Sequence, residues 1–175
     1  EQRIYTSNIA DRSLSVLDVP GRRLLRTVDA GASNQRMTLS PDGRWFVTNL
    51  WQSGKVAFYR TTDEQLDFHV AIEGAPFVSR FSPDGRWLYN MGIAPQGSQP
   101  AGIRVWRIDT ATRAVVATSI DALGVGTGSL QVSPVNGQVY LTAYSGQVSV
   151  LDPLSLKLLR QFPAAETPDG LFFSP

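Results

Sequence analysis

Short segments in which polar and apolar residues alternate recur along the whole chain. Residues 13–18 (SLSVLD) and 147–152 (QVSVLD) are two clear examples. Alternation with a period of two is typical of half-buried β-strands, because successive side chains of a strand point to opposite faces. No segment keeps an apolar period of 3.6 residues for long, and Pro153 and Pro163 bracket the one short candidate helix at 157–160. The pattern therefore predicts an all-β protein.

A turn motif divides these strands into repeats. Ser-Pro-Asp-Gly occurs at residues 40–43 and 82–85, a degenerate Ser-Pro-Val-Asn-Gly at 133–137, and a further Ser-Pro at 174–175. In such a turn Pro presets φ, Asp caps the local backbone and Gly supplies a positive φ. We therefore interpret Asp42 and Asp84 as turn residues and not as a catalytic pair of carboxylates.

Each repeat is predicted to hold four strands. The repeats span approximately residues 3–43, 44–85, 86–137 and 138–175. The sixteen expected strands are 3–8, 13–18, 22–28, 35–40, 44–49, 55–60, 65–72, 77–82, 86–90, 103–109, 113–120, 129–133, 138–142, 147–152, 157–162 and 170–174. Four-stranded units that recur every ~40–50 residues are typical of β-propeller blades, whereas solenoid coils carry fewer strands. We predict an all-β β-propeller with four four-stranded antiparallel blades in this chain.

The repeats also resemble a known family. Residues 44–49 (RWFVTN), which follow the first Ser-Pro-Asp-Gly turn, resemble the YVTN-type β-propeller repeat, and 148–152 (VSVLD) match its next strand. The resemblance covers the whole chain and implies a ring of seven or eight blades, of which this chain supplies four. Related propellers include periplasmic proteins of unknown role, amine dehydrogenase heavy chains, the propeller of cytochrome-type nitrite reductases, and lactonases. The resemblance thus implies a periplasmic or otherwise exported protein, and it selects no single activity.

Composition excludes several chemistries. The 175 residues include 16 Lys and Arg against 15 Asp and Glu, a formal net charge of +1 that does not favour nucleic-acid binding. The absence of Cys excludes thiolate-bound metals and covalently attached c-type haem, and a single histidine, His69, excludes a multi-histidine metal site within this chain. No apolar run reaches the ~18 residues of a membrane span. No cofactor is evident, although a haem or a quinone stays open if further blades complete the ring.

A binding site is expected on the face opposite the Ser-Pro-Asp-Gly turns. In propellers of this family the strand that ends in that turn is innermost, and binding sites commonly surround the central channel. The loops at the opposite face contribute the candidate residues Ser33, Asn34, Gln35, Trp51, Gln52, Pro76, Phe77, Tyr144, Thr167 and Asp169. Arg36 and Arg80 join them, because alternate side chains of an innermost strand face the channel and arginine binds carboxylate or phosphate. The alternative for either arginine is a structural pair with an aspartate between blades.

Other conspicuous segments receive structural interpretations. Residues 92–102 are an insertion, either a tolerated surface loop or a lid over the channel. Trp45, Trp87 and Trp106 suit packing between blades, and His69 is expected on an outer strand. The Gly-rich residues 124–128 have no helix after them and read as a connection between blades rather than a phosphate loop.

Two classes of function remain. The preferred hypothesis is a non-enzymatic scaffold whose channel face binds a protein or a small ligand. The alternative is part of a propeller enzyme, either a lactonase-like hydrolase or a quinoprotein or haem-associated oxidoreductase, and the lack of a carboxylate–histidine constellation disfavours it. If further repeats follow, this chain is a fragment of a larger propeller; if Pro175 is the true end, residues 170–174 could complete the three-stranded N-terminal unit of their own chain, or two chains could form one eight-bladed ring as a homodimer.

Overall fold

The computed structural model describes residues 3–96 and 99–174 of the chain. These residues form β-strands and one short 3-10 turn, η1 (Trp51–Ser53). The strands are β1 (Arg3–Asn8), β2 (Ser13–Asp18), β3 (Arg23–Asp29), β4 (Asn34–Leu39), β5 (Trp45–Leu50), β6 (Lys55–Arg60), β7 (Leu66–Ala71), β8 (Ala75–Phe81), β9 (Trp87–Gln96), β10 (Gln99–Asp109), β11 (Ala114–Thr118), β12 (Thr127–Val132), β13 (Val139–Ala143), β14 (Gln147–Leu151) and β15 (Leu158–Pro163). The all-β prediction is confirmed.

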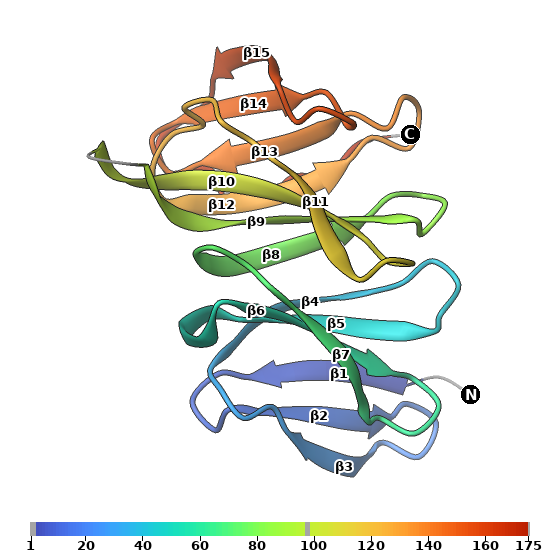
Figure 1. Cartoon of the computed structure of the whole chain (residues 1–175). Helices are drawn as coiled ribbons and strands as arrows, with labels where there is room; N and C mark the ends of the chain where they lie inside the picture. The colour runs from blue at the N-terminus through green and yellow to red at the C-terminus, as the bar shows by residue number, and fades with distance from the viewer. Residues whose placement is uncertain (1–2, 97–98, 175) are drawn as a thin grey trace.

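The strands form four antiparallel sheets in chain order. The first sheet has three strands, β1-β2-β3, and the other three have four each, β4 to β7, β8 to β11 and β12 to β15. The sheets stack side by side, with β1–β3 at one end of the stack and β12–β15 at the other (Figure 1). The second, third and fourth sheets each begin one strand earlier than the corresponding repeats counted from turn to turn, because each Ser-Pro-type turn joins the first two strands of a sheet.

One predicted strand is absent. We expected residues 170–174 to form the last of sixteen strands, but they have no regular secondary structure, and the side chain of Phe172 is 85% exposed. In the other repeats the equivalent strand pairs with the strand that follows it, as β4 pairs with β5. Among the described residues no strand lies after residues 170–174 to pair with them. Fifteen strands therefore form within the described residues.

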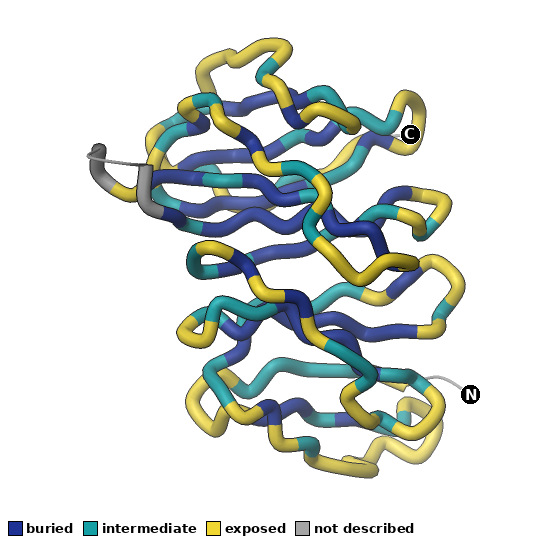
Figure 2. Tube along the Cα trace, in the orientation of Figure 1, coloured by how far each residue is buried: buried dark blue, intermediate teal, exposed yellow. Residues whose placement is uncertain are grey.

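Apolar side chains pack between consecutive sheets. The buried residues, dark blue in Figure 2, lie mainly along the strands in the middle of the stack. Phe46 stacks between Tyr5 of the first sheet, at 4.3 Å, and Tyr59, at 5.2 Å between ring centroids. Trp45 and Trp106 are buried between sheets, as predicted. The outermost strands β3 and β15 are almost wholly exposed. The core is therefore a set of layers between sheets rather than one central cluster.

The Thr-Asn pair of the repeat motif supports a β-bulge in the innermost strand. Pairing of β4 with β5 shifts register between Gln35 and Met37, which leaves backbone carbonyls outside the ladder. Thr48 Oγ1 donates to the Gln35 carbonyl at 2.8 Å, and Asn49 Nδ2 donates to the Arg36 carbonyl at 2.7 Å. These two side chains thus satisfy the carbonyls that the bulge frees.

The Ser-Pro-Asp-Gly motifs are turns, as predicted. Asp42 Oδ1 accepts hydrogen bonds from Ser40 Oγ at 2.6 Å and from the Arg44 N–H at 3.0 Å. These bonds, that from Ser40 first, hold the pKa of Asp42 below its usual value. Asp84 makes the same two bonds to Ser82 and the Arg86 N–H, and the pKa of Asp84 is lowered in the same way.

The insertion at 92–102 differs from its prediction. Strands β9 and β10 continue into it, and Ile93 pairs with Ile103 and Ala94 with Gly102. The segment is mainly a lengthened hairpin, because its backbone groups pair with each other, and not a loop or lid; residues 97–98 lie outside the described chain. His69 is exposed on the outer strand β7, as expected. Residues 124–126 belong to the connection between β11 and β12, and β12 begins at Thr127.

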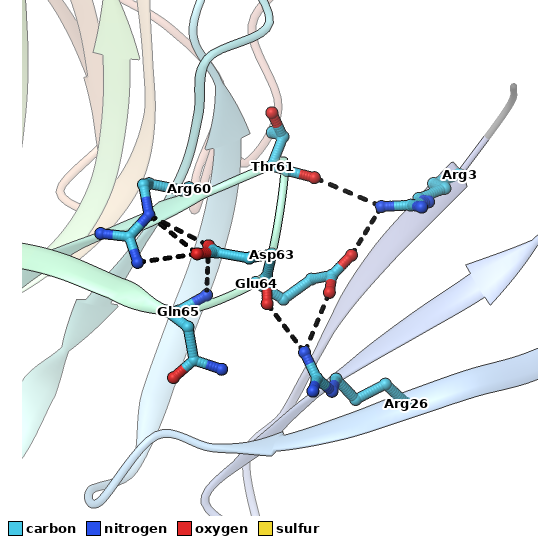
Figure 3. Close-up of polar contacts among 7 residues, drawn as sticks. All are labelled: Arg3, Arg26, Arg60, Thr61, Asp63, Glu64 and Gln65. Carbon is cyan, nitrogen blue, oxygen red and sulfur yellow. Dashed lines mark hydrogen bonds and ion pairs between the residues drawn. The ribbon is translucent and has the colours of Figure 1, made fainter.

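A charged contact joins the first two sheets near the turn between β6 and β7. Glu64 accepts from Arg3 Nη1 at 2.6 Å and from Arg26 Nη1 at 3.1 Å (Figure 3). Arg26 Nη1 also donates to the Asp63 carbonyl at 2.7 Å. The contact holds the three-stranded sheet against its neighbour at the edge, outside the apolar layer.

Candidate functional site

Most of the predicted site residues lie at the end of the sheets opposite the Ser-Pro-Asp-Gly turns, whereas Arg80 lies further along β8, two residues before Ser82. The strands β4 and β8 begin at this end and finish in those turns. The Trp51 N–H donates to the Ser33 carbonyl at 3.1 Å, and the Thr167 N–H donates to the Tyr144 carbonyl at 3.3 Å. Loops that are far apart in sequence therefore share one face of the protein. We call this end of the molecule the loop face.

An ion pair spans the loop face. Arg36 Nη2 on β4 donates to Asp169 Oδ1 at 3.0 Å and Oδ2 at 2.9 Å, although 133 residues separate the two. Their side chains are 35% and 45% exposed. One nitrogen holds both oxygens, so the remaining Arg36 N–H groups have no acceptor among the described residues. This contact is the Arg–Asp pair that the sequence analysis gave as the structural alternative. It leaves the other N–H groups of Arg36 available to a ligand.

Two aromatic side chains, Phe77 and Trp51, lie beside Arg36. Its guanidinium lies over the Phe77 ring, 5.0 Å from the centroid. Trp51 meets Phe77 edge to face, with centroids 5.7 Å apart and planes at 78°. Trp51 opens η1, and Gly54 ends that turn in a left-handed conformation with φ 61°. Arg36, Trp51, Phe77 and Asp169 thus form one contiguous surface from three different regions of the chain.

Arg80 adds a second cation. Its side chain is half-buried on β8, and Arg80 Nη1 donates to the Ser79 carbonyl at 2.8 Å. Burial, with a contribution from the charge of Arg36, lowers the pKa of Arg80. Among the residues that the structure describes, no carboxylate pairs with it. The site therefore holds two guanidiniums and the single carboxylate of Asp169.

The other predicted residues lie in different environments. Asn34 is fully buried, and its Nδ2 donates to the Ser13 carbonyl at 3.1 Å, which ties the second sheet to the first. Gln35 is half-buried. Tyr144 is 40% exposed in the turn between β13 and β14, where its carbonyl meets the Thr167 N–H. Asn34 therefore has a structural position, whereas Tyr144 borders the segment that carries Asp169.

Sequence reasoning missed a buried polar cluster beneath the site. Asn49 Oδ1 accepts from Ser79 Oγ at 2.7 Å and from Asn90 Nδ2 at 2.6 Å. Because Asn49 also donates to the Arg36 carbonyl, this cluster joins the strands that carry Arg36 and Arg80. The Thr-Asn motif was the signal for Asn49, but nothing in the sequence indicated that its partners come from the next repeat.

Within residues 3–96 and 99–174, the His, Asp and Glu side chains form no group of three or more that could hold a metal ion. In that same part of the chain no helix is long and apolar enough to cross a membrane.

Comparisons with known proteins address the fold. No protein-family model matches the sequence, and no curated protein matches it. Hydrazine synthase from Kuenenia stuttgartiensis is similar in structure, with a TM-score of 0.77 and 18% identity over 91% of this chain and 45% of the other. A putative 6-phosphogluconolactonase from Bacteroides uniformis has a TM-score of 0.72 and 16% identity over 95% and 53%.

The chain has a β-propeller fold. Its four sheets are blades, and β4, β8 and β12 are their innermost strands. The chain spans about half the length of these solved structures. At such low identity the likeness shows the fold alone, so what the loop face binds is argued from this chain's own residues.

Proposed function

We propose that this propeller is a binding module of the YVTN-repeat type, and that its loop face binds a small anionic ligand between Arg36 and Arg80. The observation that carries the proposal is the environment of Arg80. Its guanidinium is half-buried, donates to one carbonyl and stands in the field of a second guanidinium. A desolvated charge without a counter-ion is costly, and an anion that enters the site removes much of that cost.

Other half-buried arginines of the chain show that Arg80 is unusual. Arg104 donates to the carbonyls of Ser119 and Asp121, and Arg107 donates to those of Pro153 and Leu154. Arg80 donates to a single carbonyl, that of Ser79. Arg80 is thus the half-buried arginine whose hydrogen-bonding capacity is least used.

The surroundings suit an organic anion. Carboxylates and phosphates match the planar fork of a guanidinium, and Arg36 keeps donors free for one of them. Phe77 and Trp51 supply an apolar surface against which a carbon skeleton can pack. Asp169 already places a carboxylate on Arg36, so an external ligand competes with it. The site is therefore expected to prefer ligands that carry more than one acidic group.

Titration with succinate and inorganic phosphate, followed by calorimetry, tests the proposal. We expect Arg80→Gln and Arg36→Gln to weaken binding at least tenfold, about 1.4 kcal/mol. Asp169→Asn should tighten binding, because it removes the competing charge. Arg107→Gln is the matched control, since Arg107 is also half-buried but donates to the Pro153 carbonyl in the turn between β14 and β15, at the end of the sheets opposite the loop face. Equal affinity in the wild type and Arg80→Gln would refute the proposal.

The alternative function is that of part of a propeller enzyme. Its support is that the similar structures include hydrazine synthase and a putative 6-phosphogluconolactonase. His69 lies exposed on an outer strand, so it supplies no base to the loop face. Hydrolysis of a sugar lactone that is lost in both Arg36→Gln and Arg80→Gln would favour this alternative. Visible absorbance of the purified protein would reveal a bound haem.

Membership of the YVTN family and export to the periplasm are part of the same proposal. They are supported by the Ser-Pro-Asp-Gly turns and the Thr-Asn strand, whose roles in turn and bulge the structure explains. Cell fractionation with a periplasmic marker enzyme tests the location.

A further inference from the structure

A small cleft lies between the second and third blades. It has a volume of about 180 Å³. One wall comes from the connection between β7 and β8, and the others come from β9, from β10 and from the end of β11 with the residues that follow it. Its lining includes Glu73, Ala94, Arg104, Trp106 and Ile120. We call it the Glu73 cleft, and it shares no residue with the anion site proposed above.

The third blade departs from the repeat at this cleft. When the blades are aligned by strand pairing, Arg104 holds the position of Lys55 in the second blade, and Trp106 holds that of Ala57. Strands β9 and β10 are also longer than the other strands, with 10 and 11 residues, and Ala94 lies in their added part. The other blades form without these features, so the propeller scaffold does not require them.

Arg104 is held in place with part of its guanidinium unused. The side chain is half-buried, and Nη1 donates to the carbonyls of Ser119 at 3.0 Å and Asp121 at 3.4 Å. Nε and Nη2 have no acceptor among the described residues. A guanidinium binds a carboxylate through two parallel hydrogen bonds, and these two nitrogens form one edge that can donate both. Because the backbone contacts already order Arg104, binding costs little further side-chain entropy.

Glu73 lies on a tight connection of the second blade. The Gly74 N–H donates to the Ile72 carbonyl at 2.9 Å, and the Ile72 N–H donates to the Gly54 carbonyl at 2.7 Å. Gly74 has a φ of 148°, and a Cβ at this position would lie 2.5 Å from the Ile93 carbonyl oxygen. The connection is therefore packed closely against the β9–β10 hairpin. The exposed side chain of Glu73 has no hydrogen-bond or ion-pair partner among the described residues.

The cleft thus holds one positive and one negative group that do not neutralise each other. Arg104 and Glu73 both line it, yet within the described part of the chain neither of them forms an ion pair. A molecule that carries a carboxylate and an ammonium group complements both charges. Ile120 is 78% exposed and offers apolar surface beside them. The volume suits a single amino acid and is small for a peptide.

We propose that the Glu73 cleft binds a free α-amino acid with an apolar side chain. Arg104 donates from Nε and Nη2 to the carboxylate of the ligand, and Glu73 accepts hydrogen bonds from its ammonium group. The apolar side chain packs against Ile120. This inference does not rest on the proposed function, because the anion site uses other residues.

Calorimetric titration with leucine and two analogues tests the proposal. Isocaproate is leucine without the ammonium group, and isoamylamine is leucine without the carboxylate. We expect leucine to bind about tenfold or more tightly than either analogue, since each analogue leaves one charge of the cleft without a partner. Glycine should also bind more weakly than leucine, because it has no side chain to pack against Ile120.

Variants assign each group of the ligand to its residue. Glu73→Gln should weaken leucine about tenfold and leave isocaproate unchanged, whereas Arg104→Gln should weaken leucine and leave isoamylamine unchanged. A merely structural role of either residue would weaken all three ligands together. Lys55→Gln is the matched control, because Lys55 is half-buried at the position equivalent to Arg104 in the second blade and does not line the cleft.

Three results would overturn the proposal. The first is a wild-type protein that does not bind leucine, and the second is a Glu73→Gln variant that weakens leucine and isocaproate equally. The third is leucine binding that is lost in Arg80→Gln but kept in both cleft variants, which would assign leucine to the anion site. If circular dichroism shows that Arg104→Gln disturbs the fold, Glu73→Gln still decides, because Glu73 is exposed and has no described partner to lose.

Discussion

The first two blades use the same kind of strand in two different ways. All six residues of β5 are buried, whereas no residue of β1 is buried. The two strands occupy the same place in their repeats and pair with the next strand in the same register. β5 has β4 on its inner side, whereas no strand among the described residues pairs with that side of β1. The difference shows that the innermost strand, and not the motif itself, decides whether the second strand of a blade becomes core.

Hydrogen bonding follows the same division. Thr48 and Asn49 of β5 bind carbonyls of the innermost strand. At the equivalent positions of β1, Thr6 Oγ1 donates locally to Asn8 Oδ1 at 3.3 Å, and Ser7 Oγ has no partner among the described residues. The motif therefore stabilises a blade only where a fourth strand accepts its side chains. Three predictions probe this contrast, starting with the largest effect.

The first prediction concerns the pair Phe46 and Ile4. Phe46→Ala should lower the free energy of unfolding by about 3–5 kcal/mol, because it opens a cavity between Tyr5 and Tyr59. Ile4→Ala should cost less than about 1 kcal/mol, because Ile4 is half-exposed. Urea denaturation of the two variants measures both values. Similar costs would show that Ile4 is covered as well as Phe46 is.

The second prediction concerns the pair Asn49 and Ser7. Asn49→Ala should cost about 2–3 kcal/mol, since it leaves Ser79, Asn90 and the Arg36 carbonyl short of partners in a buried site. Ser7→Ala should change stability by less than about 0.5 kcal/mol, because the hydroxyl has no partner to lose among the described residues. Thermal unfolding of the two variants compares them. A large loss for Ser7→Ala would break the comparison.

The third prediction has the smallest effect and concerns the two Ser-Pro-Asp-Gly turns, which join β4 to β5 and β8 to β9. The pKa values of Asp42 and Asp84 are lowered in the folded state, so these carboxylates stabilise the fold above their unfolded pKa near 3.8. That stability is lost as pH falls through the lower folded values. It should amount to about 1 kcal/mol or less for both turns, because water screens exposed carboxylates.

The variant Asp42→Asn with Asp84→Asn tests this dependence. The third turn already uses Asn136, whose Oδ1 accepts from the Gln138 N–H at 3.0 Å, so asparagine suits the turn geometry. The urea midpoint should decrease more between neutral pH and about pH 3 in the wild type than in the double variant. Equal falls in both proteins would mean that other carboxylates account for the acid sensitivity.

Much of the fold and part of the site could be predicted from sequence. The repeated turns and the alternation of residues predicted fifteen of the strands, because each depends on residues a few positions apart. Repeat position was enough to place Arg36, Trp51, Phe77 and Asp169 on one face. The partner of Arg36 was left open between a ligand and an aspartate, and a contact across 133 residues could not be read from local pattern.

The misses share a cause. Residues 170–174 carry the pattern of an innermost strand but form none, and Asn34 looked like a loop residue but is buried against Ser13. Both outcomes depend on which distant segment lies alongside. The half-buried, unpaired position of Arg80 likewise arises from the approach of β4 and β8 and not from its own neighbours in sequence.

The sequence by itself determined the turns, the strand pattern and the four-fold repetition of this propeller, since backbone sterics and the two-residue period act over a few residues. Only the tertiary structure decided which edges are covered, which polar groups are paired and which charges stand unbalanced. Those properties depend on segments brought together from different blades. The ion pair between Arg36 and Asp169, which are 133 residues apart, is one example.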